Sequence, residues 1–177
     1  MLFSALHRRA AAEPLARRAS PLPMPAYWLM KSEPDEASID HLAAAPQQTL
    51  AWTGVRNYQA RNFMRDAMQP GDGVLFYHSS CAEPGIAGLA RIVGGLAPDT
   101  TQFDPHSPYF DPKADPAQPR WLQIDVQLVR KTRLLPLRAL REAPSVASLQ
   151  VLQRGNRLSI TPVTPQEWQA VLALLDA

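Results

Sequence analysis

Alternating hydrophobic and polar positions predict several short strands along the chain. The clearest alternation places every second apolar side chain on one face, as expected of a half-buried strand: Leu122, Ile124, Val126 and Leu128. Short apolar runs bounded by turn residues predict four more strands, at 27–31, 74–78, 86–93 and 157–163. We expect Gly94-Gly95 to end the strand 86–93, because paired glycines usually punctuate regular structure.

A 3.6-residue repeat predicts an amphipathic helix near residue 60. Its apolar positions follow the i, i+3, i+4, i+7, i+8 spacing of one buried helix face: Ala60, Phe63, Met64, Ala67 and Met68. Pro70-Gly71 then ends the helix and turns the chain.

Capping signals mark two further helices. Ser38 precedes a brief helix that reaches Leu42, and Thr164 with Glu167 forms a capping box for a helix ending near Leu175. Short helical segments are also predicted at 134–141 and 146–153. The proline-rich segment 98–119 has no regular pattern, and long irregular loops inside a compact domain are often functional.

The order of these elements predicts an α+β fold. Strands and helices are interspersed without strict βαβ alternation, which favours a small, curled, mixed barrel of five to six strands flanked by helices. The 177 residues suffice for one domain with a proper core. We therefore expect a leader over residues 1–24 and one domain over 25–177.

Charge is distributed unevenly between the leader and the domain. Residues 1–23 contain four arginines and one glutamate; removing them from the chain's 18 basic and 16 acidic residues leaves 14 and 15. The domain therefore lacks the overall excess of positive charge that would bind phosphate backbones along its whole surface, and any contact with nucleic acid must be made at a local site. The leader has no apolar core of a secretory signal. A disordered tail, an upstream start codon before Met24 and a transit peptide all remain open for it.

Composition also restricts the redox, metal and membrane chemistry. The single Cys81 cannot form an internal disulfide, and the four histidines form no H-x-x-x-H pair. No glycine-rich phosphate-binding motif and no long apolar run is present. We therefore expect no cofactor, no metal and no membrane contact. A monomer in the cytoplasm is the default, since the excess of Arg over Lys suits a GC-rich bacterial genome.

The stretch WTGVRNYQARNFMR, residues 52–65, combines planar hydrogen-bond donors with aromatic rings. The helical stripe accounts for Phe63 and Met64 as core but leaves the polar residues on other faces. Asparagine is a poor helix former and is usually present for a hydrogen bond. A polar pocket and a structural network explain Asn57 and Asn62 equally well.

A second polar cluster, FYHSSC at residues 76–81, follows a predicted strand. Strand ends that lead into loops often hold functional residues. One hypothesis is a small hydrolase that uses His78 as a base with Ser79 or Cys81 as nucleophile. The chain has no G-x-S-x-G nucleophile elbow, so this hypothesis ranks below binding. A protein-interaction module that uses the segment 98–119 is a further alternative.

Four motifs in order along the chain resemble the EVE domain family of the PUA-like superfamily. They are YWLMKSEP at 27–34, WTGVRNYQARN at 52–62, FYHS at 76–79 and RLS at 157–159. The resemblance covers about residues 25 to 175 and is specific, because four motifs occur in register. Thr53 and the loop 80–84 depart from the family pattern, and both are expected at the rim of a pocket.

The resemblance implies a PUA-like pseudo-barrel that binds a ligand without catalysis. Superfamily relatives such as YTH domains bind modified bases by flipping them into an aromatic cage. The implied partner is therefore nucleic acid with a modified base, either a modified cytosine in DNA or a modified base in RNA. Trp52 and Trp28 are candidate stacking walls, although an apolar strand also suits Trp28 as core. The implied ligand-binding residues are Lys31, Ser32, Trp52, Arg56, Asn57, Tyr58, Arg61, Asn62, Tyr77, His78, Ser79, Arg157 and Ser159.

Overall fold

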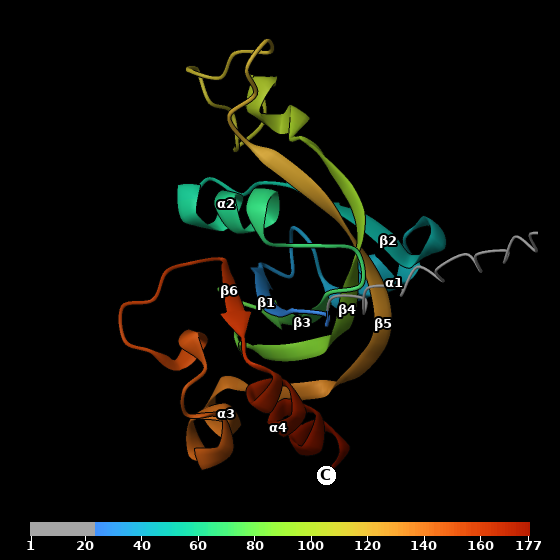
Figure 1. Ribbon diagram of the computed structural model, residues 1–177, viewed down its shortest axis with the longest axis vertical. Coiled ribbons are helices and arrows are strands. Elements are labelled where there is room, and N and C mark those ends of the chain that lie inside the picture. Colours follow the sequence, from blue (N-terminus) through green and yellow to red (C-terminus); the bar gives the residue numbers. More distant parts are fainter. Residues whose placement is uncertain (1–23) are drawn as a thin grey trace, which may run out of the picture.

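A six-stranded mixed sheet forms the centre of the molecule (Figure 1). The computed structural model describes residues 24–177, so the predictions for the leader at 1–23 fall outside the described residues. The strands lie in the order β2-β5-β4-β3-β1-β6. Their bounds are Tyr27–Ser32 (β1), Thr49–Trp52 (β2), Gly73–His78 (β3), Gly85–Pro98 (β4), Leu122–Pro136 (β5) and Ile160–Val163 (β6).

The sheet curls strongly but does not close. β1 and β3 run parallel, and every other neighbouring pair is antiparallel. Over residues 24–177, β2 and β6 remain the two edges and do not pair with each other. The α+β class and the PUA-like arrangement of a mixed, curled sheet are confirmed, and the sheet does not close into a barrel.

In the described part of the chain, four helices and four short 3₁₀ turns surround the sheet. The helices are α1 (Ile39–Ala44), α2 (Tyr58–Asp66), α3 (Leu137–Glu142) and α4 (Pro165–Asp176). Ser38 and Thr164 cap α1 and α4 as predicted, each through a side-chain oxygen that accepts a backbone N–H. The predicted helix 146–153 is wrong, because this region holds 3₁₀ turns at Pro144–Val146 and Gln150–Leu152.

Several strand boundaries differ from the sequence-based expectation. β4 continues through Gly94-Gly95 to Pro98, and β5 extends to Pro136, beyond the start of the predicted helix 134–141. The predicted strand 157–163 begins only at Ile160. β2 was not predicted, and it forms a short edge that pairs with β5.

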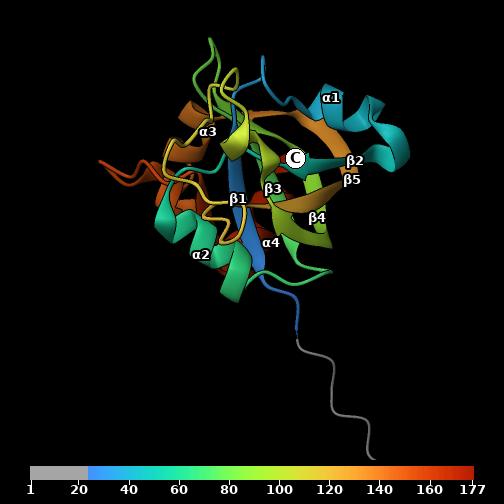
Figure 2. The ribbon, with the colours of Figure 1, turned by 90° about the horizontal axis from the view of Figure 1, so that it is seen from above.

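Both faces of the central strands are buried. In β1, Trp28 and Met30 belong to one hydrophobic cluster, whereas Leu29 belongs to a second. The first cluster includes side chains of α1 and α2, and the second includes side chains of α3 and α4. Figure 2 shows α1 and α2 on opposite sides of β1. Alternate residues of each central strand therefore build two separate cores.

Trp28 is a core residue whose polar end is satisfied inside the fold. Its indole N–H donates to the buried carboxylate of Asp72 at 2.9 Å, and its ring lies 5.4 Å from that of Phe63. Asp72 also accepts the backbone N–H groups of Ala26 and Gln69, so it ties the start of β1 to the turn before β3. The stacking role that was considered for Trp28 is therefore not supported.

Candidate functional site

A pocket of about 620 Å³ opens between the end of β1, β2 and the long loop that joins β4 to β5. This volume lies within the range of about 300–1,000 Å³ that is typical of small-ligand sites. The elements that line it are far apart in sequence, from the loop 33–37 to the residues 157–159 before β6.

Apolar side chains form the inner wall of the pocket. Phe76 and Leu42 are fully buried, and Trp52 is 7% exposed. The rings of Trp52 and Phe76 meet edge to face, with centroids 5.3 Å apart. Val55 and Val126 complete this wall. The inner wall is therefore aromatic and aliphatic, which suits a flat apolar ring.

Polar and charged side chains line the rest of the pocket. Their members are Lys31, Ser32, Glu33, Glu36, Thr53, Ser79, Ser80, Thr101, Tyr109, Arg157 and Ser159. Burial lowers the pKa of Lys31 below its usual value, because desolvation disfavours the charged ammonium. A ligand in this pocket would therefore meet an apolar wall on one side and donors and acceptors on the other.

The predicted ligand-binding residues divide into two groups. Six of them line the pocket: Lys31, Ser32, Trp52, Ser79, Arg157 and Ser159. The other seven lie outside its lining: Arg56, Asn57, Tyr58, Arg61, Asn62, Tyr77 and His78. Thr53 and Ser80, at the two departures from the family pattern, both line the pocket.

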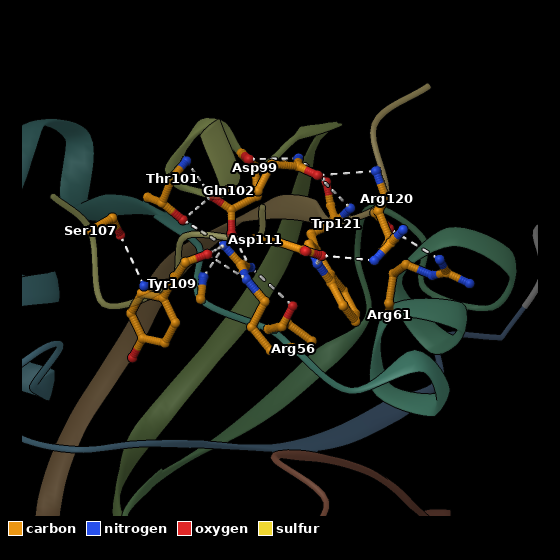
Figure 3. Close-up of polar contacts among 12 residues, drawn as sticks. Arg56, Arg61, Asp99, Thr101, Gln102, Ser107, Tyr109, Asp111, Arg120 and Trp121 are labelled. Carbon is orange, nitrogen blue, oxygen red and sulfur yellow. Dashed lines mark hydrogen bonds and ion pairs between the residues drawn. The ribbon is translucent and has the colours of Figure 1, made fainter. Parts of the chain in front are cut away.

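Arg56 holds the long loop, residues 99–121, against the pocket wall. Its Nη1 donates to Asp99 Oδ2 at 2.8 Å, and its Nη2 donates to Thr101 Oγ1 at 2.9 Å. The carbonyl of Tyr109 accepts from Nε at 2.8 Å and from Nη2 at 2.6 Å. Figure 3 shows this fork of donors pointing into the loop. A guanidinium suits this role better than an ammonium would, because it is planar and holds several N–H donors in a fixed arrangement.

Asp99 is fully buried and serves as the acceptor at the base of the loop. It accepts from Arg56, from the backbone N–H of Gly54 at 2.9 Å, and from both N–H and hydroxyl of Thr101. Burial alone would raise the pKa of Asp99, but the hydrogen bonds from Thr101, Arg56 and Gly54 outweigh it and lower the pKa. The folded state therefore favours the ionised carboxylate.

Acid should consequently weaken the fold through Asp99. Because the folded-state pKa lies below the unfolded value of about 3.9, the contribution is complete above that value and is lost as the pH falls through the folded pKa. We expect urea denaturation between pH 7 and pH 2 to show that the free energy of unfolding falls more steeply with decreasing pH for the wild type than for Asp99→Asn. The same dependence of the free energy of unfolding on pH in the two proteins would contradict this role.

Gln102 joins the two ends of the same loop. Its Nε2 donates to the carbonyls of Asp99 and Trp121, at 2.7 and 2.9 Å. Its Oε1 accepts from the backbone N–H groups of Arg120 and Trp121, at 3.0 and 3.1 Å. Gln102 is fully buried, and these four bonds use every donor and acceptor of its amide (Figure 3). The loop is therefore a fixed part of the fold.

The polar face of α2 packs on the loop and does not face the pocket. Tyr58 stacks on Trp121 with ring centroids 4.9 Å apart, and the guanidinium of Arg61 lies 4.8 Å from the Tyr58 ring. Arg61 also donates to the carbonyl of Arg120 and to Asn62 Oδ1. For these residues the structure shows a network that anchors the loop.

Asn57 and Tyr77 also have structural partners. The side chain of Asn57 is the N-cap of α2 and accepts from the backbone N–H groups of Gln59 and Ala60, at 2.9 and 3.1 Å. Tyr77 is buried in the second hydrophobic cluster, on the face of β3 opposite to Phe76. Both placements follow from helix capping and strand alternation.

His78 is held by the backbone of α1. Its Nε2 accepts the N–H of Ile39 at 3.0 Å, and burial lowers the pKa of its imidazole. Ser79 Oγ donates to the carbonyl of Ser32 at 3.3 Å, not to His78. In this arrangement the base nitrogen that the hydrolase hypothesis requires is already engaged.

Three residues that line the pocket were not among the predicted site residues: Glu33, Glu36 and Tyr109. Tyr109 lies in the proline-rich segment 98–119, which was expected to be functional. The irregular composition of this segment is therefore the sequence signal that could have pointed to Tyr109.

Residues 24–177 contain neither a cluster of metal-ligating side chains nor a helix suited to crossing a membrane. No group of three or more His, Cys, Asp or Glu side chains there could hold a metal ion. No helix in that range is long and apolar enough to cross a membrane.

Comparison with known proteins identifies relatives over nearly the whole domain. The family model described as EVE domain matches residues 26–174. Human thymocyte nuclear protein 1 is 45% identical over 165 residues, which cover 84% of this chain and 73% of that protein.

Solved structures agree with the sequence relatives. A crystal structure of a Pseudomonas putida protein is 51% identical, with a TM-score of 0.79 over 84% of this chain and 99% of that one. The structure of human THYN1 in complex with 5-methylcytosine-containing DNA is 44% identical, with a TM-score of 0.80 over 86% and 98%. The chain belongs to the EVE domain family.

Proposed function

We propose that this protein binds nucleic acid by taking a modified base, extruded from its stack, into the pocket beside Trp52. A modified cytosine in DNA is the first candidate and a modified base in RNA the second. The observation that carries the proposal is the pocket itself, with an aromatic inner wall and a polar lining. The human relative whose structure contains 5-methylcytosine DNA supports it.

The energetics of base extrusion fit such a pocket. Removing a base from its stack costs a few kcal/mol, and contact with an aromatic side chain returns about 1–3 kcal/mol. Phe76 and Trp52 offer that apolar contact, while Lys31, Ser32 and Ser159 offer hydrogen bonds to the polar edge of the base. A methyl group added to the base would gain further by burial, at about 0.8 kcal/mol per carbon.

The charge of the domain suits an interaction dominated by the pocket. The part from residue 24 onward has 14 basic and 15 acidic residues once the leader is removed from the totals of 18 and 16. Few phosphate contacts should form, so the affinity should depend only weakly on salt. Arg157 lines the pocket, and in this proposal its guanidinium holds one phosphate beside the extruded base.

Binding to a panel of short oligonucleotides tests this function. Each DNA or RNA probe carries one modified base, and its control carries the unmodified base, at one fixed salt concentration. We expect the full chain to prefer one modified base by at least about tenfold, or about 1.4 kcal/mol. Equal binding to every modified probe and its control would overturn the proposal and favour a protein partner. The mass of each probe after incubation shows whether it has been altered chemically.

A pair of variants on β2 locates the binding. Leu50, on the same face of the strand as Trp52, lines the pocket, whereas Thr49 lies on the opposite face and outside the lining. Leu50→Trp should abolish the preference by occupying the pocket, and Thr49→Trp should leave it intact. If both variants keep the preference, the base binds elsewhere.

The monomeric state and the cytoplasmic location stay predictions from the sequence.

A further inference from the structure

We infer that Glu36 selects the class of base, favouring one with an exocyclic amino group, such as cytosine, over one with a carbonyl in its place, such as thymine or uracil. This inference rests on the proposed function and assigns a specificity-determining residue in the same pocket. Glu36 lines the pocket, and its carboxylate accepts a hydrogen bond from the hydroxyl of Tyr109, another pocket residue.

Tyr109 is itself fixed from two sides. Its carbonyl accepts two hydrogen bonds from Arg56, and its ring lies against the backbone of Gly54. A Cβ atom at Gly54 would approach the Tyr109 ring to 2.8 Å, and Gly54 also has a positive φ of 78°. Glycine is therefore required there. The anchored tyrosine in turn gives the Glu36 carboxylate a defined position at the edge of the pocket.

The hydrogen bond between Tyr109 and Glu36 has a fixed direction at neutral pH. Burial, together with the hydrogen bond to the Glu36 carboxylate, raises the pKa of Tyr109 to about 12, so its hydroxyl stays protonated and donates. An ionised carboxylate only accepts, and one hydroxyl occupies only part of its capacity. No cation within residues 24–177 forms an ion pair with Glu36. The remaining lone pairs are available to a donor on the ligand.

The edge of the base decides whether that carboxylate attracts or repels. Cytosine presents an amino donor at position 4, where thymine presents a carbonyl oxygen, and carboxylates accept from this amino group. 5-Methylcytosine and thymine carry the same methyl group and differ at position 4, which holds an amino group or a carbonyl, and at N3, which is an acceptor in 5-methylcytosine and carries a proton in thymine. With thymine, the carbonyl oxygen at position 4 and the Glu36 carboxylate would be two acceptors facing each other, and both would lose hydrogen bonds to water.

The experiment compares these two bases directly. The probes are duplexes with 5-methylcytosine, thymine or cytosine opposite an abasic site, so that no base pair has to be broken for extrusion. We expect the full wild-type chain to bind the 5-methylcytosine probe about 10- to 100-fold more tightly than the thymine probe, corresponding to about 1–3 kcal/mol of discrimination.

Three variants test whether this ratio depends on Glu36. Glu36→Gln can turn its amide to donate or accept, so the ratio should fall to within about threefold of unity, mainly through weaker binding of the 5-methylcytosine probe. Asp35→Asn removes the same charge from the neighbouring residue, which does not line the pocket, and should leave the ratio unchanged. Tyr109→Phe removes the donor that positions Glu36 and should reduce the ratio by a smaller factor. Thermal melting confirms that each variant is folded.

The possible outcomes separate this inference from the proposed function. A wild-type preference that persists in Glu36→Gln overturns the role of Glu36. Equal wild-type binding of 5-methylcytosine and thymine, with both preferred over cytosine, overturns the inference but leaves a reader of the methyl group. Equal binding of all three probes here, and of every modified probe and control in the wider panel, overturns both proposals.

Discussion

Arg56→Ala should destabilise the protein by about 3 kcal/mol and release the loop 99–121. The substitution removes every bond from the guanidinium to Asp99, Thr101 and Tyr109, and it leaves the fully buried Asp99 carboxylate without its cation. Breaking one partner of a buried pair costs about 3–5 kcal/mol, and the 21% exposure of the Arg56 side chain favours the lower end. Urea denaturation at pH 7 measures the change.

Limited proteolysis gives a second measurement of the same variant. Lys113 is exposed in the loop, and trypsin should cut after it much faster once Arg56 no longer holds the carbonyl of Tyr109. Arg65→Ala is the matched control, because Arg65 is exposed near the end of α2 and pairs only with its neighbour Asp66. That control should match the wild type in both measurements. An Arg56→Ala protein with wild-type stability and a protected Lys113 would contradict the anchoring role.

Local signals in the sequence predicted the elements that depend on local physics. The apolar stripe through Ala60 and Met64 is the buried face of α2, and the capping box of Thr164 and Glu167 opens α4. A helix cap and a helical face involve residues only three or four positions apart. Such features are therefore visible in a single sequence.

The sheet was harder to predict because its geometry depends on distant partners. Gly94 and Gly95 have positive φ and lie at irregular positions of the β4–β5 pairing, where they let β4 curl and continue instead of ending. A Cβ atom at Gly95 would come within 2.0 Å of Asp125 on β5. A pair of glycines marks a turn in most contexts, and only the partner strand shows that here it permits close approach.

The motif WTGVRNYQARN illustrates the same distinction at the site. Its first residues, Trp52 and Thr53, line the pocket, and their role in ligand binding stays a prediction. Three later residues, Arg56, Tyr58 and Arg61, hold the loop 99–121, whose approach could not be derived from the motif itself. Tyr58 and Arg61 stack around Trp121, a residue that no sequence argument had connected to them. The same donors and rings can build a pocket or an anchor, and the distant partner decides which.

Trp52→Ala should lower the free energy of unfolding by about 3–5 kcal/mol, the usual range for truncating a buried tryptophan. Trp52 belongs to the first hydrophobic cluster and contacts Phe76, so the truncation leaves a cavity that joins the pocket. Urea denaturation measures this effect. Stability equal to that of the wild type would show that Trp52 is not part of the core.

Loss of base binding in Trp52→Ala would not by itself demonstrate stacking, because the pocket would also change shape. Trp52→Phe separates the two roles, since a smaller aromatic ring can still contact Phe76 and should destabilise the protein less than alanine does. If the indole stacks on the base, the phenylalanine variant should bind the modified probe about 5- to 20-fold more weakly, corresponding to about 1–2 kcal/mol of stacking surface. A folded phenylalanine variant with wild-type affinity would confine Trp52 to the core and assign the contact with the base to Phe76 and the residues around it.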